Sequence, residues 1–185
     1  MLSDLPNDHQ LSDLKKALSF VNAFNVAVDI GAHRGILTSV LCDQFECVHS
    51  FEPTDLAHKI DQRALVHKMA LGPNEGFCAM QPGKTNSGQT YVVSGDDTRM
   101  NTLDSFGLKP SFIKIDVEGY EVPVLHGARE TIMRSRPVIM FEDNGLCERY
   151  GYQINDCGIL LRTWGMKEVA VLSKWQRGAD YVYAF

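Results

Sequence analysis

The chain has 185 residues, of which 44% are hydrophobic and 22% charged, and its formal net charge is −5 at pH 7. These values are typical of one globular domain, residues 1–185, and the acidic balance gives no general attraction to nucleic acid. The apolar runs 26–30 and 138–141 are too short to cross a bilayer, and residues 1–10 lack the basic start of a signal peptide. We therefore expect a cytoplasmic protein that binds neither a membrane nor a nucleic acid.

Strand-like and helix-like patterns alternate along the chain, which predicts an α/β fold with a mostly parallel sheet. The N-terminal segment 1–22 contains a helical spacing of apolar residues over 11–20. A strand is expected over 26–30, a helix after Gly35 and a second strand over 47–51. The first unit is thus strand, turn, helix, strand.

The middle of the chain predicts a helix over 55–63, a strand over 65–70, and a hairpin that pairs 77–80 with 90–93. Residues 81–98 are rich in Gly, Ser, Asn and Asp. Because loops on a rigid scaffold often carry specificity, we expect this segment to be the substrate loop, although an ordinary hairpin connection has the same composition.

The C-terminal part predicts a strand over 112–116, a helix over 120–134, a strand over 138–142 and a helix over 152–163. Two closing strands, 167–172 and 181–185, have no crossover helix between them. Such a pair is expected to be antiparallel.

A glycine turn follows the first strand, in the segment Val28-Asp29-Ile30-Gly31-Ala32-His33-Arg34-Gly35, and Glu52 ends the second strand. In doubly wound folds the ligand lies at the carboxyl ends of the strands, where an acid ending the second strand accepts the ribose hydroxyl protons. The pairing predicts a site for a nucleoside-bearing cofactor. A purely structural alternative is that Gly31 makes a tight turn and Glu52 caps the next helix.

The glycine spacing distinguishes between two cofactors. A dinucleotide fingerprint would need glycine where this chain has His33 and Ile36. This departure disfavours NAD and favours S-adenosylmethionine, which has no pyrophosphate and whose ammonium group suits a carboxylate such as Asp29.

Further acidic residues stand at and beyond the fourth strand, in the segment Ile113-Lys114-Ile115-Asp116-Val117-Glu118-Gly119-Tyr120-Glu121. An unpaired Lys114 would be costly inside this apolar strand, so it is expected to point toward a cleft or to pair with an acid. Together with "VDIGA", "FEP" and "TLDSF", in this order, the segment resembles the FkbM family of S-adenosylmethionine-dependent methyltransferases. The resemblance implies a Rossmann-like class I methyltransferase fold, with a mostly parallel seven-stranded sheet, an antiparallel C-terminal strand and helices on both faces.

The resemblance also implies roles for individual residues. The methionine part of the cofactor would be surrounded by Asp29, Gly31, Ala32 and Gly35, the ribose would lie at Glu52, and the adenine would lie near Met69 or Ala70. His33 stands where the family commonly has Asn, so it replaces that residue or merely lines the turn. Asp116 is expected to line the same site.

Four carboxyl groups are candidates for a general base that takes the proton of the acceptor: Asp116, Glu118, Glu142 and Asp143. Alternatively, Asp116, Asp143 and Asn144 offer hard oxygen ligands for Mg²⁺, or the acids simply favour nearby helix starts. We expect O-methylation of a hydroxyl on a sugar, glycan precursor or other small metabolite. The other hypotheses are a non-catalytic S-adenosylmethionine-binding module and a nucleotide-dependent oxidoreductase.

Overall fold

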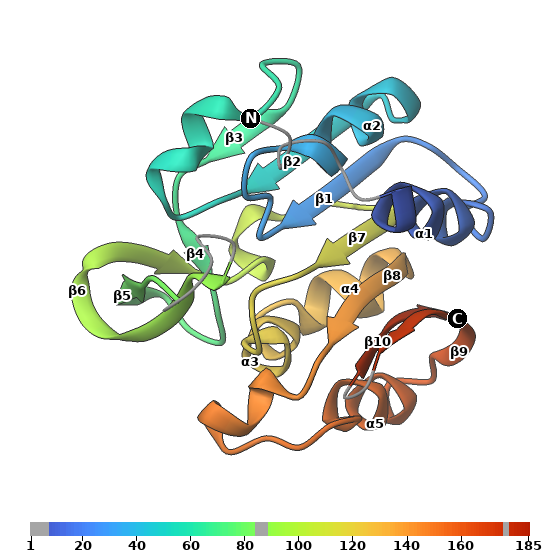
Figure 1. Cartoon of the computed structure of the whole chain (residues 1–185). Coiled ribbons are helices and arrows are strands. Elements are labelled where there is room, and N and C mark those ends of the chain that lie inside the picture. Colours follow the sequence, from blue (N-terminus) through green and yellow to red (C-terminus); the bar gives the residue numbers. More distant parts are fainter. Residues whose placement is uncertain (1–7, 84–88, 176–177) are drawn as a thin grey trace.

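A seven-stranded sheet runs through the molecule, as the computed structural model of the chain shows (Figure 1). The structure describes residues 8–83, 89–175 and 178–185. In spatial order the strands are β3 (Leu65–His67), β2 (Cys47–Phe51), β1 (Val26–Ile30), β7 (Phe112–Ile115), β8 (Val138–Asp143), β10 (Gly178–Ala184) and β9 (Lys167–Trp175). The first five pair in parallel, and β10 is antiparallel to both of its neighbours. The predicted class I fold is confirmed.

Helices cover both faces of this sheet, because the central parallel strands are apolar on both sides. On one face α1 (Asp8–Leu18) and α2 (Ile36–Gln44) bury Leu14 and Leu41 against Phe112. On the other face α3 (Glu121–His126), α4 (Arg129–Ser135) and α5 (Asp156–Thr163) pack with Ile113 in a second apolar cluster. Within the described residues, no helix is long and apolar enough to span a membrane.

A small second sheet lies beside the main one (Figure 1) and contains β4 (Ala70–Leu71), β6 (Tyr91–Asn101) and β5 (Gly76–Gln81), in that spatial order. The predicted hairpin is confirmed, since Met80 pairs with Val92 in antiparallel register. The loop expected over 81–98 is shorter than predicted, because β6 already begins at Tyr91; residues 84–88 lie outside the described residues. The strand predicted over 65–70 is divided between the two sheets, as β3 and β4.

The helix predicted over 120–134 is interrupted at Gly127, between α3 and α4. A Cβ atom on Gly127 would lie 1.9 Å from the carbonyl oxygen of Gly72, so only glycine permits this close approach. The amide of Gly72 in turn donates to the carbonyl of Asn101 on β6. The small sheet is therefore held against the junction of the two helices.

Several other predicted helices are shorter or shifted in the structure. The helix expected over 55–63 is a 3-10 helix, η1 (Asp55–Lys59), which Thr54 caps by accepting a hydrogen bond from the amide of Leu56. The helix expected over 152–163 begins only at Asp156, and α1 begins before residue 11. Two further 3-10 helices are η3 (Asp104–Phe106) and η4 (Leu146–Tyr150).

Candidate functional site

A cavity of about 350 Å³ lies at the carboxyl ends of β1, β2 and β7, next to the small sheet. This is the edge at which open α/β sheets bind their ligands, and the volume falls in the range of small-molecule sites. The predicted site residues that line it are Gly31, Ala32, His33, Glu52, Met69, Ala70, Asp116, Glu118 and Glu142. Asp29, Gly35 and Asp143 do not line this cavity.

Gly31 forms the turn that follows β1, and it lines the cavity. Its φ is +79°, and a Cβ atom there would lie 1.8 Å from the carbonyl oxygen of Asp116. The turn therefore requires glycine for both its conformation and its contact with the chain after β7. Gly35 instead lies at the start of α2, where its φ of +76° and the nearby Ile60 backbone exclude a side chain, so it acts on the cavity only by shaping the turn.

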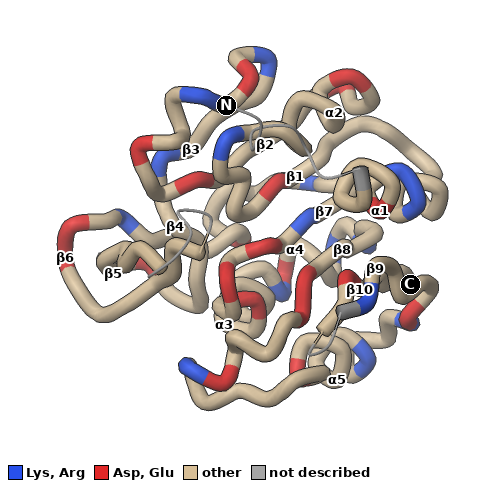
Figure 2. Tube along the Cα trace, in the orientation of Figure 1, with Lys and Arg blue, Asp and Glu red and all other residues tan. Residues whose placement is uncertain are grey.

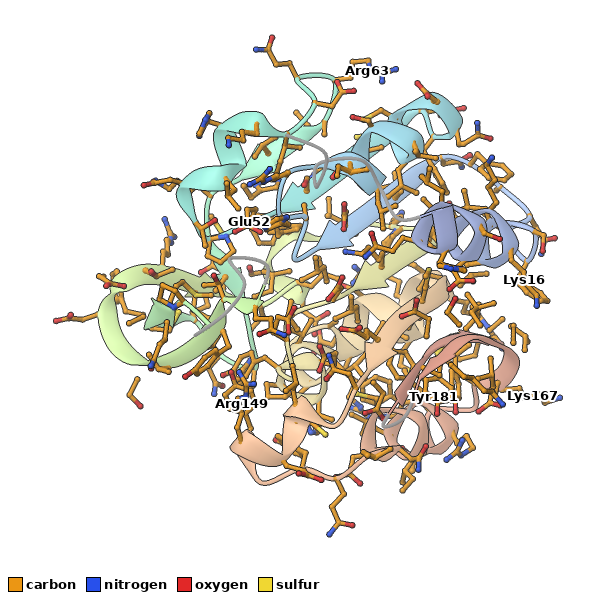
Figure 3. The ribbon with its side chains drawn as sticks, in the orientation of Figure 1. Lys16, Glu52, Arg63, Arg149, Lys167 and Tyr181 are labelled. Carbon is orange, nitrogen blue, oxygen red and sulfur yellow. The ribbon has the colours of Figure 1, made fainter. Side chains whose placement is uncertain are left out.

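The carboxylate of Glu52 is fixed by three donors from the chain. Oε2 accepts from the amide of His33 at 2.8 Å, while Oε1 accepts from the amide and the hydroxyl of Thr54 at 2.9 and 2.6 Å. Figure 3 shows Glu52 between the end of β2 and the small sheet. Because a carboxylate has about four acceptor positions, Glu52 retains capacity for a ligand hydroxyl.

Asp29 is fully buried behind the glycine turn and does not line the cavity. The Thr38 hydroxyl donates to its Oδ2 at 2.6 Å, and the ammonium of Lys114 lies 3.2 Å from its Oδ1. Lys114 also donates to the carbonyl of Gly31 and lies 3.5 Å from Oδ2 of Asp116. Lys114 was expected either to point toward a cleft or to pair with an acid, and in the structure it does both.

The environment of Lys114 keeps its ammonium charged. Burial acts to lower the pKa of this group, but the attraction of Asp29 and Asp116 outweighs that effect and raises the pKa above its ordinary value. The positive charge is thus shared between a buried acid and an acid of the cavity. Asp29 contributes to the site through this ion pair.

Three acids meet where β7 and β8 end, and Figure 2 shows acidic residues gathered at this edge. Asp116, Glu118 and Glu142 each place a carboxylate oxygen within 4.8 Å of the other two. The parallel register, in which Ile115 faces Phe141, brings these strand ends side by side. Asn144 donates to Oε2 of Glu142 at 2.9 Å.

The crowding of these acids changes their titration. Burial, with repulsion from Asp116, raises the pKa of Glu118 to about 7. Burial, with repulsion from Asp116 and Glu118, raises the pKa of Glu142 to about 9. Burial and repulsion among the acids therefore favour the protonated forms of Glu118 and Glu142.

Asp143 lies on the opposite face of β8 from Glu142, because side chains alternate along a strand. Its buried carboxylate accepts a hydrogen bond of 2.7 Å from the amide of Asn155, at the start of α5. The expectation that Asp143 lies among the catalytic acids is corrected by this placement. Of the three expected Mg²⁺ ligands, Asp116 and Asn144 line the cavity and Asp143 does not.

Some residues of the cavity were not identified from the sequence. Thr54 orients Glu52 and lines the cavity, and its position two residues after the acid is a signal that could have indicated it. Leu71 and Val92 add apolar surface from the small sheet. Their contribution depends on the pairing of β4 and β5 with β6, which local patterns do not reveal.

The residues present fit S-adenosylmethionine. Glu52 offers a fixed carboxylate to a ribose diol, and Met69, Ala70 and Leu71 offer an apolar wall to an adenine ring. Nε2 of His33 is buried and has no hydrogen-bond partner within the described part of the chain, so a polar ligand atom can satisfy it. The carboxylates of Asp116, Glu118 and Glu142, in the same cavity as Gly31, suit the ammonium and sulfonium charges of the methionine part.

Comparisons with known proteins agree with this arrangement. Residues 29–156 match the family described as "Methyltransferase FkbM domain". The FkbM methyltransferase from Methylobacillus flagellatus KT has a similar fold, with a TM-score of 0.58 and 19% identity over 98% of this chain and 56% of that chain. This chain thus spans little more than half the length of that relative. No match to a curated protein sequence was found.

Two other solved structures share the fold at low identity. Ribosomal protein L11 methylase from Lactobacillus delbrueckii subsp. bulgaricus gives a TM-score of 0.59 and 11% identity over 96% of this chain and 79% of that chain. The N-methyltransferase NodS from Bradyrhizobium japonicum WM9, in complex with S-adenosyl-L-homocysteine, gives 0.58 and 12% over 99% and 89%. The fold is that of class I methyltransferases, and because the family model matches more than half of this chain, the chain belongs to the methyltransferase FkbM family.

Proposed function

We propose that the protein transfers a methyl group from S-adenosylmethionine to a hydroxyl of a small polar acceptor, such as a sugar, a glycan precursor or another small metabolite. The observation that carries the proposal is a single cavity with a fixed carboxylate, Glu52, on one side and the carboxyl cluster of Asp116, Glu118 and Glu142 on the other. The first suits a nucleoside and the second suits proton transfer.

Each part of the cavity has a role in binding the donor. Glu52 accepts hydrogen bonds from the ribose hydroxyls, and Met69 and Ala70 contact the adenine. The glycine turn at Gly31 lets the methionine part approach the backbone closely, and His33 supplies a free ring nitrogen. When bound, S-adenosylmethionine supplies an electrophilic methyl group on a positively charged sulfur.

The acid cluster acts on the acceptor. Glu118, with its pKa near neutrality, takes the proton of the acceptor hydroxyl as the oxygen bonds to the methyl carbon. Burial and repulsion from Asp116, next to Glu118 in the cluster, raise the pKa of Glu118 and so make it a stronger base. Mg²⁺ is not part of the proposal, because Asp143, one of its expected ligands, lies on the face of β8 opposite Glu142 and accepts a hydrogen bond from the amide of Asn155.

A calorimetric titration with S-adenosylhomocysteine and, separately, with NAD tests the proposal. We expect S-adenosylhomocysteine to bind and Glu52→Ala to weaken the binding by about 5- to 150-fold, the effect of losing hydrogen bonds worth about 1–3 kcal/mol. The exposed Glu75, in the turn before β5, provides the control Glu75→Ala, which should leave the affinity unchanged. Circular dichroism establishes that each variant is folded.

The alternative functions give different results in the same experiment. NAD binding that Glu52→Ala abolishes would favour an oxidoreductase and overturn the proposal. Binding of S-adenosylhomocysteine without methyl transfer to any member of a broad panel of hydroxyl acceptors, followed by mass spectrometry, would favour a non-catalytic binding module.

A further inference from the structure

A second cavity, of about 420 Å³, lies between α1 and the carboxyl ends of β7 and β8, close to the start of β10. The two cavities share Gln10, Leu37, Lys114, Asp116 and Glu142, so they meet beside the acid cluster. We infer that this second cavity binds the methyl acceptor, and that the acceptor carries a protonated amine in addition to its hydroxyl. The inference rests on the proposed function, which it extends to the class of substrate.

The position of this cavity suits an acceptor. A molecule bound in it reaches the carboxylates of Asp116 and Glu142, which line both cavities. The N-terminal helix forms its roof, with His9, Gln10 and Asp13 facing the space. The roof is fixed, because Oδ2 of Asp13 accepts a hydrogen bond of 3.1 Å from the amide of Ser173 on β9 and because α1 buries its apolar face in the core.

The lining of the second cavity is strongly acidic. Its carboxyl groups come from four different elements, and the ammonium groups are those of Lys114 and Lys174. Lys114 is already engaged by Asp29 and Asp116, and Lys174 is exposed. The acids that face the space are Asp13, Asp116, Glu142 and Asp180.

Glu142 and Asp180 are two neighbouring acids of the second cavity. They are directly opposite each other in the antiparallel pair of β8 and β10, and both face α1. Like charges in such positions destabilise a sheet. Over residues 8–83, 89–175 and 178–185, neither has an ion-pair partner. Burial, with repulsion from Asp116 and Asp13, also raises the pKa of Asp180 to about 7. A positive group from a ligand would remove this repulsion.

The geometry favours an organic ammonium group over a metal ion at this position. The carboxylates close enough to share one ion are Asp116, Glu118 and Glu142, and among the described residues Asp180 does not belong to that group. A cation that engages Asp180 must therefore occupy the wider space of the second cavity. An ammonium group offers three donors, which suits several separated carboxylate oxygens, and its charge favours their ionised forms, whereas a neutral polyol brings no positive charge to this space.

The arrangement predicts how such an acceptor lies. Its ammonium group binds between Asp180 and Glu142, and its hydroxyl points along the acid cluster toward Glu118 in the first cavity. Amino alcohols and amino sugars have this chemistry. A molecule with the hydroxyl alone lacks the group that the second cavity is built to hold.

A pair of matched probes tests the inference. Glucosamine and glucose differ by one amino group, and each is titrated into the protein saturated with S-adenosylhomocysteine. We expect glucosamine to bind about 10- to 100-fold more tightly than glucose, as charge-assisted hydrogen bonds would give. Asp180→Asn should remove most of this preference and leave the affinity for S-adenosylhomocysteine unchanged. The control is Asp96→Asn, which removes an exposed acid of β6.

The outcomes separate this inference from the proposed function. If S-adenosylhomocysteine binds but the two sugars bind equally, or neither binds, the inference is overturned while the proposed function stands. A preference that survives Asp180→Asn would also overturn it. Failure of S-adenosylhomocysteine to bind would remove the proposed function itself. Should Asp180→Asn not fold, high salt applied to the unmodified protein must weaken glucosamine binding and not glucose binding.

Discussion

Lys114 on β7 and Asp29 on β1 form an ion pair inside the sheet, with 3.2 Å between Nζ and Oδ1. The two residues are register partners in neighbouring parallel strands, and both are buried. The same ammonium group binds the carbonyl of Gly31, so one buried charge connects the sheet to the turn that shapes the cavity. Removing either partner would leave the other charge buried without compensation.

We expect Lys114→Met to lower the free energy of unfolding by about 3–5 kcal/mol, the usual cost of breaking a buried ion pair from one side. Urea denaturation followed by circular dichroism measures this change. Lys16→Met, which removes an exposed ammonium group from α1, should change the stability by no more than about 0.5 kcal/mol. Equal effects of the two substitutions would show that the buried pair does not stabilise the fold.

Gly31 and Gly151 allow the contact made by the glycine turn to be separated from its backbone conformation. Their φ angles are +79° and +81°, but a Cβ atom on Gly31 would overlap the Asp116 carbonyl, whereas one on Gly151 would have no atom within 4 Å. Gly151→Ala should therefore cost only the left-handed conformation, about 1–2 kcal/mol. We expect Gly31→Ala to cost about 1–3 kcal/mol more in thermal or urea unfolding, through overpacking. A similar loss in both variants would contradict the close contact.

The raised pKa of Glu142 makes a prediction about pH. Its value is about 9 in the folded protein against an ordinary value of 4.5, so the folded state binds more protons than the unfolded state across this range. Stability therefore falls as pH rises toward 9. From about pH 7 to about pH 9, this group should remove about 2 kcal/mol of unfolding free energy.

The comparison with Glu142→Gln isolates this effect, because the amide does not titrate. Burial raises the pKa of the Cys147 thiol to about 11, which also lowers stability at alkaline pH but does so in both proteins. Urea denaturation at the two pH values should give a smaller loss for Glu142→Gln than for the unmodified protein. Parallel losses would mean that Glu142 titrates as an ordinary exposed acid.

Asp143 is expected to matter for stability and not for the site. Asp143→Ala leaves the amide of Asn155 without its acceptor, at a cost of about 1–3 kcal/mol in urea unfolding. The affinity for S-adenosylhomocysteine, measured by calorimetry below the unfolding transition, should not change. A large loss of affinity in the folded variant would contradict this prediction and show that Asp143 contributes to ligand binding.

Local patterns were sufficient to predict the strands and the edge of the sheet at which the cavity lies. The glycine turn, Glu52 and the acids after β7 were predicted because parallel strands bring their carboxyl ends to one edge. Asp29 and Asp143 lie near that edge, but neither lines the cavity. Asp29 is buried on the same face of the sheet as Lys114, and Asp143 lies on the face of β8 opposite Glu142. Along β8, the alternation of Met140 and Glu142 with Phe141 and Asp143 decides the face, once the partners of Met140 and Phe141 are known.

The features that were missed depend on contacts between distant segments. β4 pairs with β6 in the register Ala70 to Met100. The local pattern of neither segment predicts that it pairs with the other. The apolar spacing over 120–134 is helical throughout, so the break at Gly127 depends on contacts from distant segments, which are the approach of Gly72 and the hydrogen bonds of Asp104 to the first turn of α4. The second cavity likewise requires α1 to lie over β8 and β10, elements from opposite ends of the chain.

The contact between Gly72 and Gly127 has a consequence for how the protein opens. Ala70 and Leu71, which line one wall of the first cavity, are followed directly by Gly72. Gly72 contacts the junction of α3 and α4 with no side chain between the two backbones. Movement of that wall would disturb the helices that cover one face of the main sheet. The amides of β4 and of the two helices are therefore expected to exchange with solvent hydrogen as one cooperative unit.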